Sequence, residues 1–236
     1  MTDAPLPTYR LDDTIAVISL DDGKANAMST EVVDTIDGYL DRALADGARG
    51  LVIVGRPGKF SAGFNLAEMT SSAESMRALV VRGGRWMLRL YGFGLPTVAA
   101  CTGHALAGGA LTLLSCDVRV GADVPSKIGL NEVAIGMGLP KFAIELARDR
   151  LKKHSLAAST LEARIYDPAS AAKVGYLDRV VPEADVLGEA LAEARRLAEF
   201  RTGAYALTKL NLRGAMIESQ LHQIQADLDG VEMPKL

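Results

Sequence analysis

The chain has 236 residues, of which 49% are hydrophobic, 23% are charged and 5% are aromatic, and its formal net charge is −3. This length predicts one globular unit with ample apolar material for a core and, at most, an appended terminal segment. The scarcity of aromatic residues and of basic stretches argues against nucleic-acid binding, and no apolar run approaches the ~20 residues that a membrane span needs.

The first half of the chain alternates short apolar runs with glycine-rich turns and helical segments. Strands are predicted at 15–20, 50–55, 97–101 and 117–120. Ser29 is a suitable N-cap for a helix, and further helices are predicted at 74–91 and 110–115. Because 56–65 contains one proline and two glycines, we expect an irregular loop there, and a glycine-rich turn at 103–109. This repeated order indicates an α/β chain with its strands side by side.

The C-terminal third has a different character. From Pro140 onward, alanine, leucine, arginine and glutamate recur with helical spacing, as in 142–148 and 186–200. Helices gathered at one end of a chain often form an assembly surface, so we expect an oligomer.

The two cysteines give no sign of a metal site or a redox pair. Cys101 and Cys116 lack C-x-x-C and zinc-ligand spacing and stand among apolar residues, so we expect buried free thiols. The first ten residues have no basic start followed by an apolar run, which argues against a signal peptide and favours a cytoplasmic location.

Two glycine-containing loops carry the candidate chemistry, Phe60-Ser-Ala-Gly-Phe-Asn-Leu66 and Thr102-Gly-His-Ala-Leu-Ala-Gly-Gly-Ala110. Each follows an apolar strand and precedes a helix, and small residues leave the backbone N–H groups accessible. At the second loop these groups stand at a helix N-terminus, where the dipole favours negative charge. Two such loops on adjacent strands direct two donors to one point, which describes an oxyanion hole.

Other interpretations of these loops fit less well. Gly103 and Gly108 have the spacing of a phosphate loop, but Gly109-Ala110 stands where such a loop needs Lys-Ser/Thr. No G-x-G-x-x-G follows the first strand, and Ser61 lacks the G-x-S-x-G elbow of a serine hydrolase. For either loop alone, a tight turn that packs a helix on a sheet is the alternative.

These segments resemble those of the crotonase (enoyl-CoA hydratase/isomerase) family. Residues 60–66 are similar to the family's F-S-A-G-x-D-L, and 103–110 with Cys116-Asp117 are similar to its G-x-A-x-G-G-G…C-D. Residues 128–136 are similar to F-G-x-P-E-x-x-x-G, and 24–28 to an early N-A-L segment that lines the CoA site. The combination of four motifs is specific to the family, although the fold hosts several reactions.

The resemblance implies a spiral of ββα units in residues 1–185 and a C-terminal helical trimerisation region in residues 186–236. It implies a homotrimer or a dimer of trimers that acts on acyl-CoA in fatty-acid or related metabolism. Coenzyme A is then part of the substrate, with no separate cofactor and no metal.

The resemblance also implies the site residues. The N–H groups of Ala62 and Gly108 would form the oxyanion hole, and Glu132 would be the catalytic carboxylate. The residues expected to bind the substrate are Lys24, Ala25, Ala27, Ser61, Gly63, Asn65, Leu66, Trp86, Gly109 and Leu111. Lys209 is a second candidate contact for the CoA phosphates. Tyr91, Phe93 and Leu95 are candidates for the acyl pocket beside Trp86, and Lys141 and Phe142 should alter the wall beside Glu132.

A single carboxylate restricts the chemistry. The family's hydratases use two, but Leu111 occupies the first position here and only Glu132 remains. A lone carboxylate suits the transfer of a proton between two carbons of an enoyl-CoA, which is double-bond isomerisation. An apolar Leu111 should also raise the pKa of Glu132 by desolvation.

Three alternatives stay open. The chain can be a thioesterase or decarboxylase with the same oxyanion hole. It can be a CoA-binding protein without turnover. Glu132 can also be a solvated carboxylate or the cap of a turn.

Overall fold

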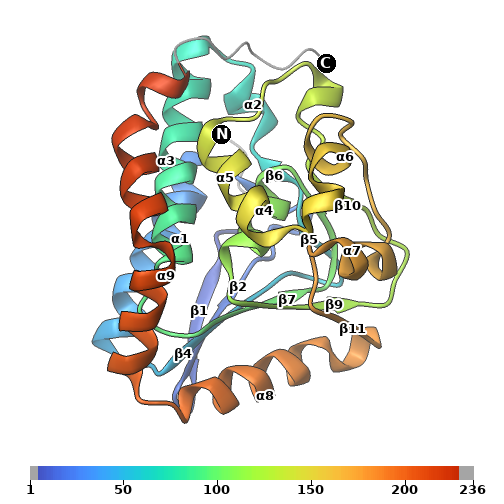
Figure 1. Cartoon of the computed structure of the whole chain (residues 1–236). Coiled ribbons are helices and arrows are strands. Elements are labelled where there is room, and N and C mark those ends of the chain that lie inside the picture. The colour runs from blue at the N-terminus through green and yellow to red at the C-terminus, as the bar shows by residue number, and fades with distance from the viewer. Residues whose placement is uncertain (1–4, 229–236) are drawn as a thin grey trace.

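The computed structural model describes residues 5–228. Its largest sheet has six strands in the order β1-β2-β4-β7-β9-β11, in which only the β1–β2 pair is antiparallel. These strands are β1 (Thr8–Asp12), β2 (Ile15–Ser19), β4 (Gly50–Val54), β7 (Thr97–Cys101), β9 (Val118–Ala122) and β11 (Arg179–Val181). One helix, α8 (Val186–Ala198), runs along one side of the sheet, and most other helices lie on the opposite side (Figure 1).

A second layer of short parallel strands repeats the order of the first. β5 (Gly58–Ser61), β8 (Gly103–Leu106) and β10 (Ile128–Gly129) follow β4, β7 and β9 and pair in the order β10-β8-β5. β3 (Ala27–Met28) follows β2 and pairs with β6 (Gly63–Phe64). The helices that complete the units are α1 (Thr30–Ala45), α2 (Leu66–Met69), α3 (Ala73–Tyr91), α4 (Gly108–Ser115) and α5 (Lys141–Arg150). This repetition confirms the predicted spiral of ββα units.

The strands of the large sheet are apolar on both faces because both faces are covered. Side chains alternate between the faces. In β2, Ala16 and Ile18 join the main core beneath α1, α3 and α4, whereas Ile15 and Val17 contact the α8 side. The α8 helix presents a stripe of Val186, Ala190, Leu191 and Ala194 to that face. Helix α8, which was predicted to belong to an assembly region, thus covers one face of the large sheet. The predicted boundary between the core and the assembly region at residue 185 stays a prediction.

The two segments expected to be irregular contain strands, so that expectation is wrong. β5 and β6 lie within 56–65, and β8 lies within 103–109. The local signal was misleading because pairing between β5 and β8 supplies hydrogen bonds that isolated glycine-rich segments lack. The glycines serve the turns between strands: Gly58 and Gly63 have φ of 73° and 91°, a region that disfavours other residues. Four further short strands, β1, β3, β10 and β11, were not predicted.

The C-terminal half adds small helices and one long one. These are α6 (Leu156–Thr160), α7 (Pro168–Val174), α9 (Thr202–Gln223) and the single turns η1 (Val133–Ile135), η2 (Lys153–Ser155), η3 (Glu183–Asp185) and η4 (Ala226–Leu228). Within residues 5–228, none of the helices combines the length and the apolar character that crossing a bilayer requires. Cys101 and Cys116 are buried free thiols, as predicted.

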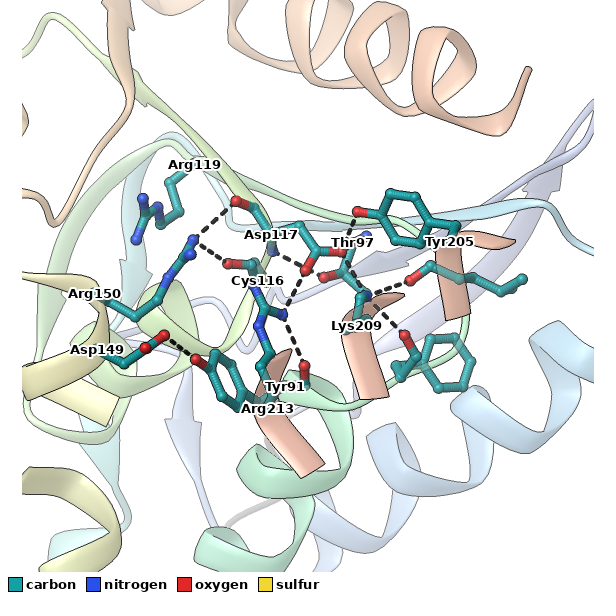
Figure 2. Close-up of polar contacts among 12 residues, drawn as sticks. Tyr91, Thr97, Cys116, Asp117, Arg119, Asp149, Arg150, Tyr205, Lys209 and Arg213 are labelled. Carbon is teal, nitrogen blue, oxygen red and sulfur yellow. Dashed lines mark hydrogen bonds and ion pairs between the residues drawn. The ribbon is translucent and has the colours of Figure 1, made fainter. Parts of the chain in front are cut away.

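A buried ionic cluster around Asp117 anchors α9 to the core (Figure 2). The Asp117 carboxylate accepts hydrogen bonds from Lys209 Nζ at 2.6 Å, Arg213 Nη1 at 2.6 Å and Tyr205 OH at 2.9 Å, all from α9. It also accepts from the N–H of Thr97 at 2.9 Å, so Asp117 orders the backbone at the start of β7 as well. Because the Lys209 side chain is only 5% exposed, the prediction that it contacts CoA phosphates is wrong.

Candidate active site

A cavity of about 410 Å³ opens where the two glycine loops meet α3 and α5. Six of the predicted site residues line it: Ala25, Ala27, Ala62, Leu66, Leu111 and Glu132. Most of the wall is apolar, as is usual for a small-molecule site with a few convergent polar groups. Sequence reasoning missed much of this wall, including Phe64, Met69, Val80, Asn131, Ile135 and Met137. These residues come from β6, α2, α3 and the segment around η1, so no local motif unites them.

The first glycine loop is held in shape by hydrogen bonds of its own residues. Ser61 Oγ donates to the carbonyl of Asn26 at 2.7 Å and accepts from the N–H of Gly63 at 3.1 Å. The N–H of Ala62 donates to the carbonyl of Ala25 at 2.9 Å. The prediction that Ala62 supplies a free oxyanion-hole donor is therefore wrong, because this N–H group is already used within the protein.

The next candidate donor in this loop is the N–H of Phe64. The N–H of Asn65 donates to the carbonyl of Met28 on β3 at 2.9 Å. Successive N–H groups of an extended strand point to opposite sides, so the Phe64 N–H points away from β3. β6 also lies against Gly108, since a Cβ atom added to Gly63 would be 2.9 Å from the Gly108 nitrogen. Asn65 also caps α2, where its Oδ1 accepts from the N–H of Glu68 at 3.1 Å.

The second glycine loop presents the N-terminus of α4. The first helical bond runs from the N–H of Leu111 to the carbonyl of Ala107 at 2.9 Å. The N–H groups of Gly108 and Gly109 precede that bond and have no intrahelical acceptor. Both glycines allow close approach of the loops: a Cβ atom on Gly109 would lie 2.2 Å from the carbonyl oxygen of Ser61. The two loops thus meet, as their place on the adjacent strands β4 and β7 predicted.

Glu132 is the acidic group of the cavity. It is 7% exposed, and its Oε2 atom has no hydrogen-bond partner among residues 5–228. Desolvation by burial raises the pKa of this carboxyl to about 7, and the fully apolar Leu111 lines the same cavity, as expected. Its backbone carbonyl accepts from the N–H groups of Ile135 and Met137, which fixes the loop. A solvated carboxylate and a side-chain cap are both excluded, since η1 has no side-chain cap hydrogen bond.

Asn26 is a buried organiser of the site that sequence reasoning did not single out. Its Nδ2 donates to the carbonyls of Leu20 at 2.8 Å and Phe60 at 3.0 Å, and its Oδ1 accepts from the N–H of Asp22 at 3.0 Å. With φ of 52° it also turns the chain into β3. Asn26 therefore ties the loop that carries Ala25 to the first glycine loop. The sequence signal that could have indicated this role is the position of Asn26 in the segment similar to the family's N-A-L.

Some predicted residues lie outside the cavity. Trp86 lines a different hollow, between α1 and α3, so its assignment to the acyl pocket is wrong. Tyr91, Phe93 and Leu95 are buried in the core and do not line the cavity. Lys24 is exposed beside Ala25 and contributes its carbonyl to Arg56. Phe142 lines the wall as expected, but the Lys141 side chain is exposed and pairs with Asp227 at 2.5 Å.

Known proteins are similar to this chain in both sequence and fold. Residues 10–233 match the family model described as enoyl-CoA hydratase/isomerase. The human mitochondrial enoyl-CoA delta isomerase 1 is 33% identical over 224 residues, which cover 91% of this chain and 72% of that protein. The structure of an enoyl-CoA hydratase/isomerase family protein from Pseudomonas syringae superimposes with a TM-score of 0.92 at 40% identity, covering 95% and 97% of the two chains.

The solved structure of a protein named as a hydratase is also similar to this chain. The enoyl-CoA hydratase from Mycobacterium ulcerans has a TM-score of 0.89 at 34% identity, covering 94% of this chain and 99% of its own. Relatives named as isomerases and relatives named as hydratases thus have similar sequence identity to this chain. The family is nevertheless the same in every comparison, and the chain is a member of the enoyl-CoA hydratase/isomerase family of enzymes.

Proposed function

We propose that the protein is an enoyl-CoA isomerase that converts 3-enoyl-CoA thioesters into 2-enoyl-CoA thioesters in fatty-acid or related acyl-CoA metabolism. The single observation that carries this proposal is the buried carboxylate of Glu132, which is the one carboxylate among the described residues that line a mainly apolar cavity. The human relative that is named as an isomerase is consistent with it.

In the proposed reaction, two backbone N–H groups hold the thioester oxygen. Those of Phe64 and Gly108 suit this role because the two loops meet at Gly63, the Phe64 N–H points away from β3, and the Gly108 N–H stands at the N-terminus of α4. They stabilise the negative charge that develops on this oxygen when the substrate loses a proton. Removal of one such donor in known enzymes costs roughly 3–4 kcal/mol of transition-state stabilisation.

Glu132 carries the proton in both steps. Its carboxylate takes a proton from Cα, and the electrons of the broken C–H bond form a dienolate on the held thioester. The protonated Glu132 then returns the same proton to Cγ, and the double bond moves from Cβ–Cγ to Cα–Cβ. No atom enters or leaves, so one group that alternates between base and acid is sufficient. A pKa of about 7 suits such a group because neither form is strongly favoured at neutral pH.

Hydration is less well supported. Addition of water across a 2-enoyl-CoA is easiest with one carboxylate for the water and another for the Cα proton. Leu111 lines the cavity at the position expected for the first carboxylate and offers neither a hydrogen-bond acceptor nor a proton. Asn131 is the other polar side chain in the lining, and an amide cannot act as a base.

A variant of Glu132 tests this proposal. Glu132→Gln keeps the size and the neutral hydrogen-bonding pattern of the protonated acid, so it should bind acyl-CoA normally and lose about 10²–10⁴-fold in isomerase kcat. The matched control is Glu183→Gln, since Glu183 is an exposed glutamate in η3. Full isomerase activity in Glu132→Gln would remove Glu132 from the mechanism, and CoA binding without any turnover by the wild type would favour the non-catalytic alternative.

We also propose that the protein assembles as a homotrimer or a dimer of trimers in the cytoplasm. Three leucines on α9 support assembly, because Leu207, Leu210 and Leu212 are exposed large apolar residues. Sedimentation equilibrium should then give three or six times the chain mass of 25.0 kDa. A monomer at micromolar concentration would contradict this assembly.

A further inference from the structure

Helix α3 contains two adjacent glycines, Gly83 and Gly84, in its interior, where glycine weakens a helix. Because these glycines have no side chains, two aromatic rings pack directly against the backbone of the helix. A Cβ atom on Gly83 would lie 2.2 Å from Cε1 of Phe64, and one on Gly84 would lie 2.8 Å from Cε1 of Phe142. Both rings line the cavity. The glycine pair therefore leaves space on α3 for two aromatic side chains that form part of the cavity wall.

Phe142 separates the cavity from the interior of the protein. Its ring is only 1% exposed and borders the cavity on one side and Gly84 on the other. Behind it stands Ile224 at the end of α9, whose Cδ1 would be 2.6 Å from a Cβ atom on Gly84. Another residue of the lining, Leu66, is 47% exposed. Phe142 is thus a buried part of the cavity wall, whereas Leu66 is a part of the wall at the protein surface.

The volume of the cavity limits the length of the chain that it can hold. A cavity of about 150 Å³ accommodates benzene, which corresponds to ~25 Å³ for each carbon. By the same measure, the cavity of about 410 Å³ holds roughly 16 non-hydrogen atoms. The thioester and the adjoining end of the pantetheine arm occupy about six of these places, which leaves room for roughly ten carbons of acyl chain.

We propose that Phe142, seated on Gly84 and backed by Ile224, determines chain-length specificity and limits the substrate to medium-chain acyl-CoA thioesters of up to about ten carbons. This inference rests on the proposed function, because it takes acyl-CoA as the ligand. It adds the class of acyl chain and the residue that selects it.

The test measures binding, so it does not depend on turnover. Saturated acyl-CoA thioesters with 4, 6, 8, 10, 12 and 14 carbons are titrated into the wild-type protein by isothermal calorimetry. Each methylene buried should lower Kd about fourfold, and this gain should end near ten carbons. A Kd that continues to fall through 14 carbons would overturn the inference alone. Failure to bind any of the thioesters would overturn the proposed function as well.

Three variants locate the limit. Phe142→Leu removes part of the inner wall and should move the limit to about 12 carbons. Gly84→Ala should displace the ring toward the cavity and lower the limit by about two carbons. The matched control is Phe93→Leu, which alters a buried ring outside the cavity and should leave the limit unchanged. Circular dichroism checks that each variant is folded. Phe142→Leu and Gly84→Ala should shift the chain-length limit in opposite directions, so either variant tests the inference if the other does not fold. An unchanged limit in a folded Phe142→Leu or Gly84→Ala would overturn it.

Discussion

Replacement of Glu132 by glutamine should stabilise the folded protein in alkaline solution. Burial raises the pKa of this carboxyl from 4.5 to about 7, so the folded state disfavours its ionisation. The neutral side chain contributes stability that is fully present below pH 4.5 and is lost as the pH rises through about 7. Glutamine stays neutral at every pH and does not lose that contribution.

The magnitude follows from the pKa difference. At 1.36 kcal/mol for each pKa unit, the wild type should lose about 1 kcal/mol by pH 5 and about 3 kcal/mol by pH 8, relative to its stability in acid. Glu132→Gln should therefore gain about 2 kcal/mol over the wild type between these two pH values. For a chain of this length, the full ~3 kcal/mol corresponds to about 6–12 °C in Tm.

Urea denaturation at pH 5, 6, 7 and 8 measures this difference, at one protein concentration throughout. Glu183→Gln, which alters an exposed glutamate, should show a small difference from the wild type that does not grow with pH. The reasoning is refuted if Glu132→Gln is less stable than the wild type at pH 8, or if its advantage is the same at pH 5 and pH 8.

Four further predictions follow from the same contacts. The isomerase kcat/KM should fall about tenfold for each pH unit below about 7, because Glu132 must be ionised to act as a base; a pH–rate profile that is flat to pH 5 would exclude it. Gly83→Ala should displace the Phe64 ring and its backbone and lower kcat about 10–100-fold with little change in the Kd for octanoyl-CoA, as stopped-flow and calorimetric measurements would show. Leu111→Glu should raise hydration of 2-enoyl-CoA about 100-fold by supplying a second carboxylate, and chromatography would detect the 3-hydroxyacyl-CoA. Asp117→Asn leaves Lys209 and Arg213 buried without a counter-charge and should lower the free energy of unfolding by about 3–5 kcal/mol in urea, more than Asp178→Asn, whose carboxylate is 40% exposed.

Much of the fold was predictable because the local sequence indicates the strands of the large sheet. Apolar runs such as 50–55 and 97–101 are continuous, since both sheet faces are covered, and Ser29 caps its helix as expected, with its Oγ 3.2 Å from the N–H of Val32. The short strands β5, β6 and β8 were not predictable, because β5 pairs with β8 and β6 pairs with β3, and the paired positions lie far apart in the sequence, as Gly58 and Gly103 or Ala27 and Gly63 do. Local propensity does not contain that information.

The site was predictable in chemistry and less so in detail. The motif around Glu132 and the loss of the first carboxylate at Leu111 were readable from the sequence, and both side chains meet in one cavity. The donor in the first loop was assigned to Ala62, whose N–H is taken by the carbonyl of Ala25, because a sequence motif does not say which N–H groups of a loop are already bound within the protein. Trp86 was misplaced because helical spacing does not say which side of α3 faces the cavity.

Identification of the first product formed from a 3-enoyl-CoA tests the central claim most directly. The purified protein is incubated with 3-octenoyl-CoA, and the earliest products of the wild type and of Glu132→Gln are identified by mass spectrometry and ultraviolet absorbance. A single carboxylate that moves one proton should give a conjugated 2-octenoyl-CoA of unchanged mass, and Glu132→Gln should give almost none. A product heavier by one water molecule, free coenzyme A, or equal conversion by the two proteins would contradict the mechanism.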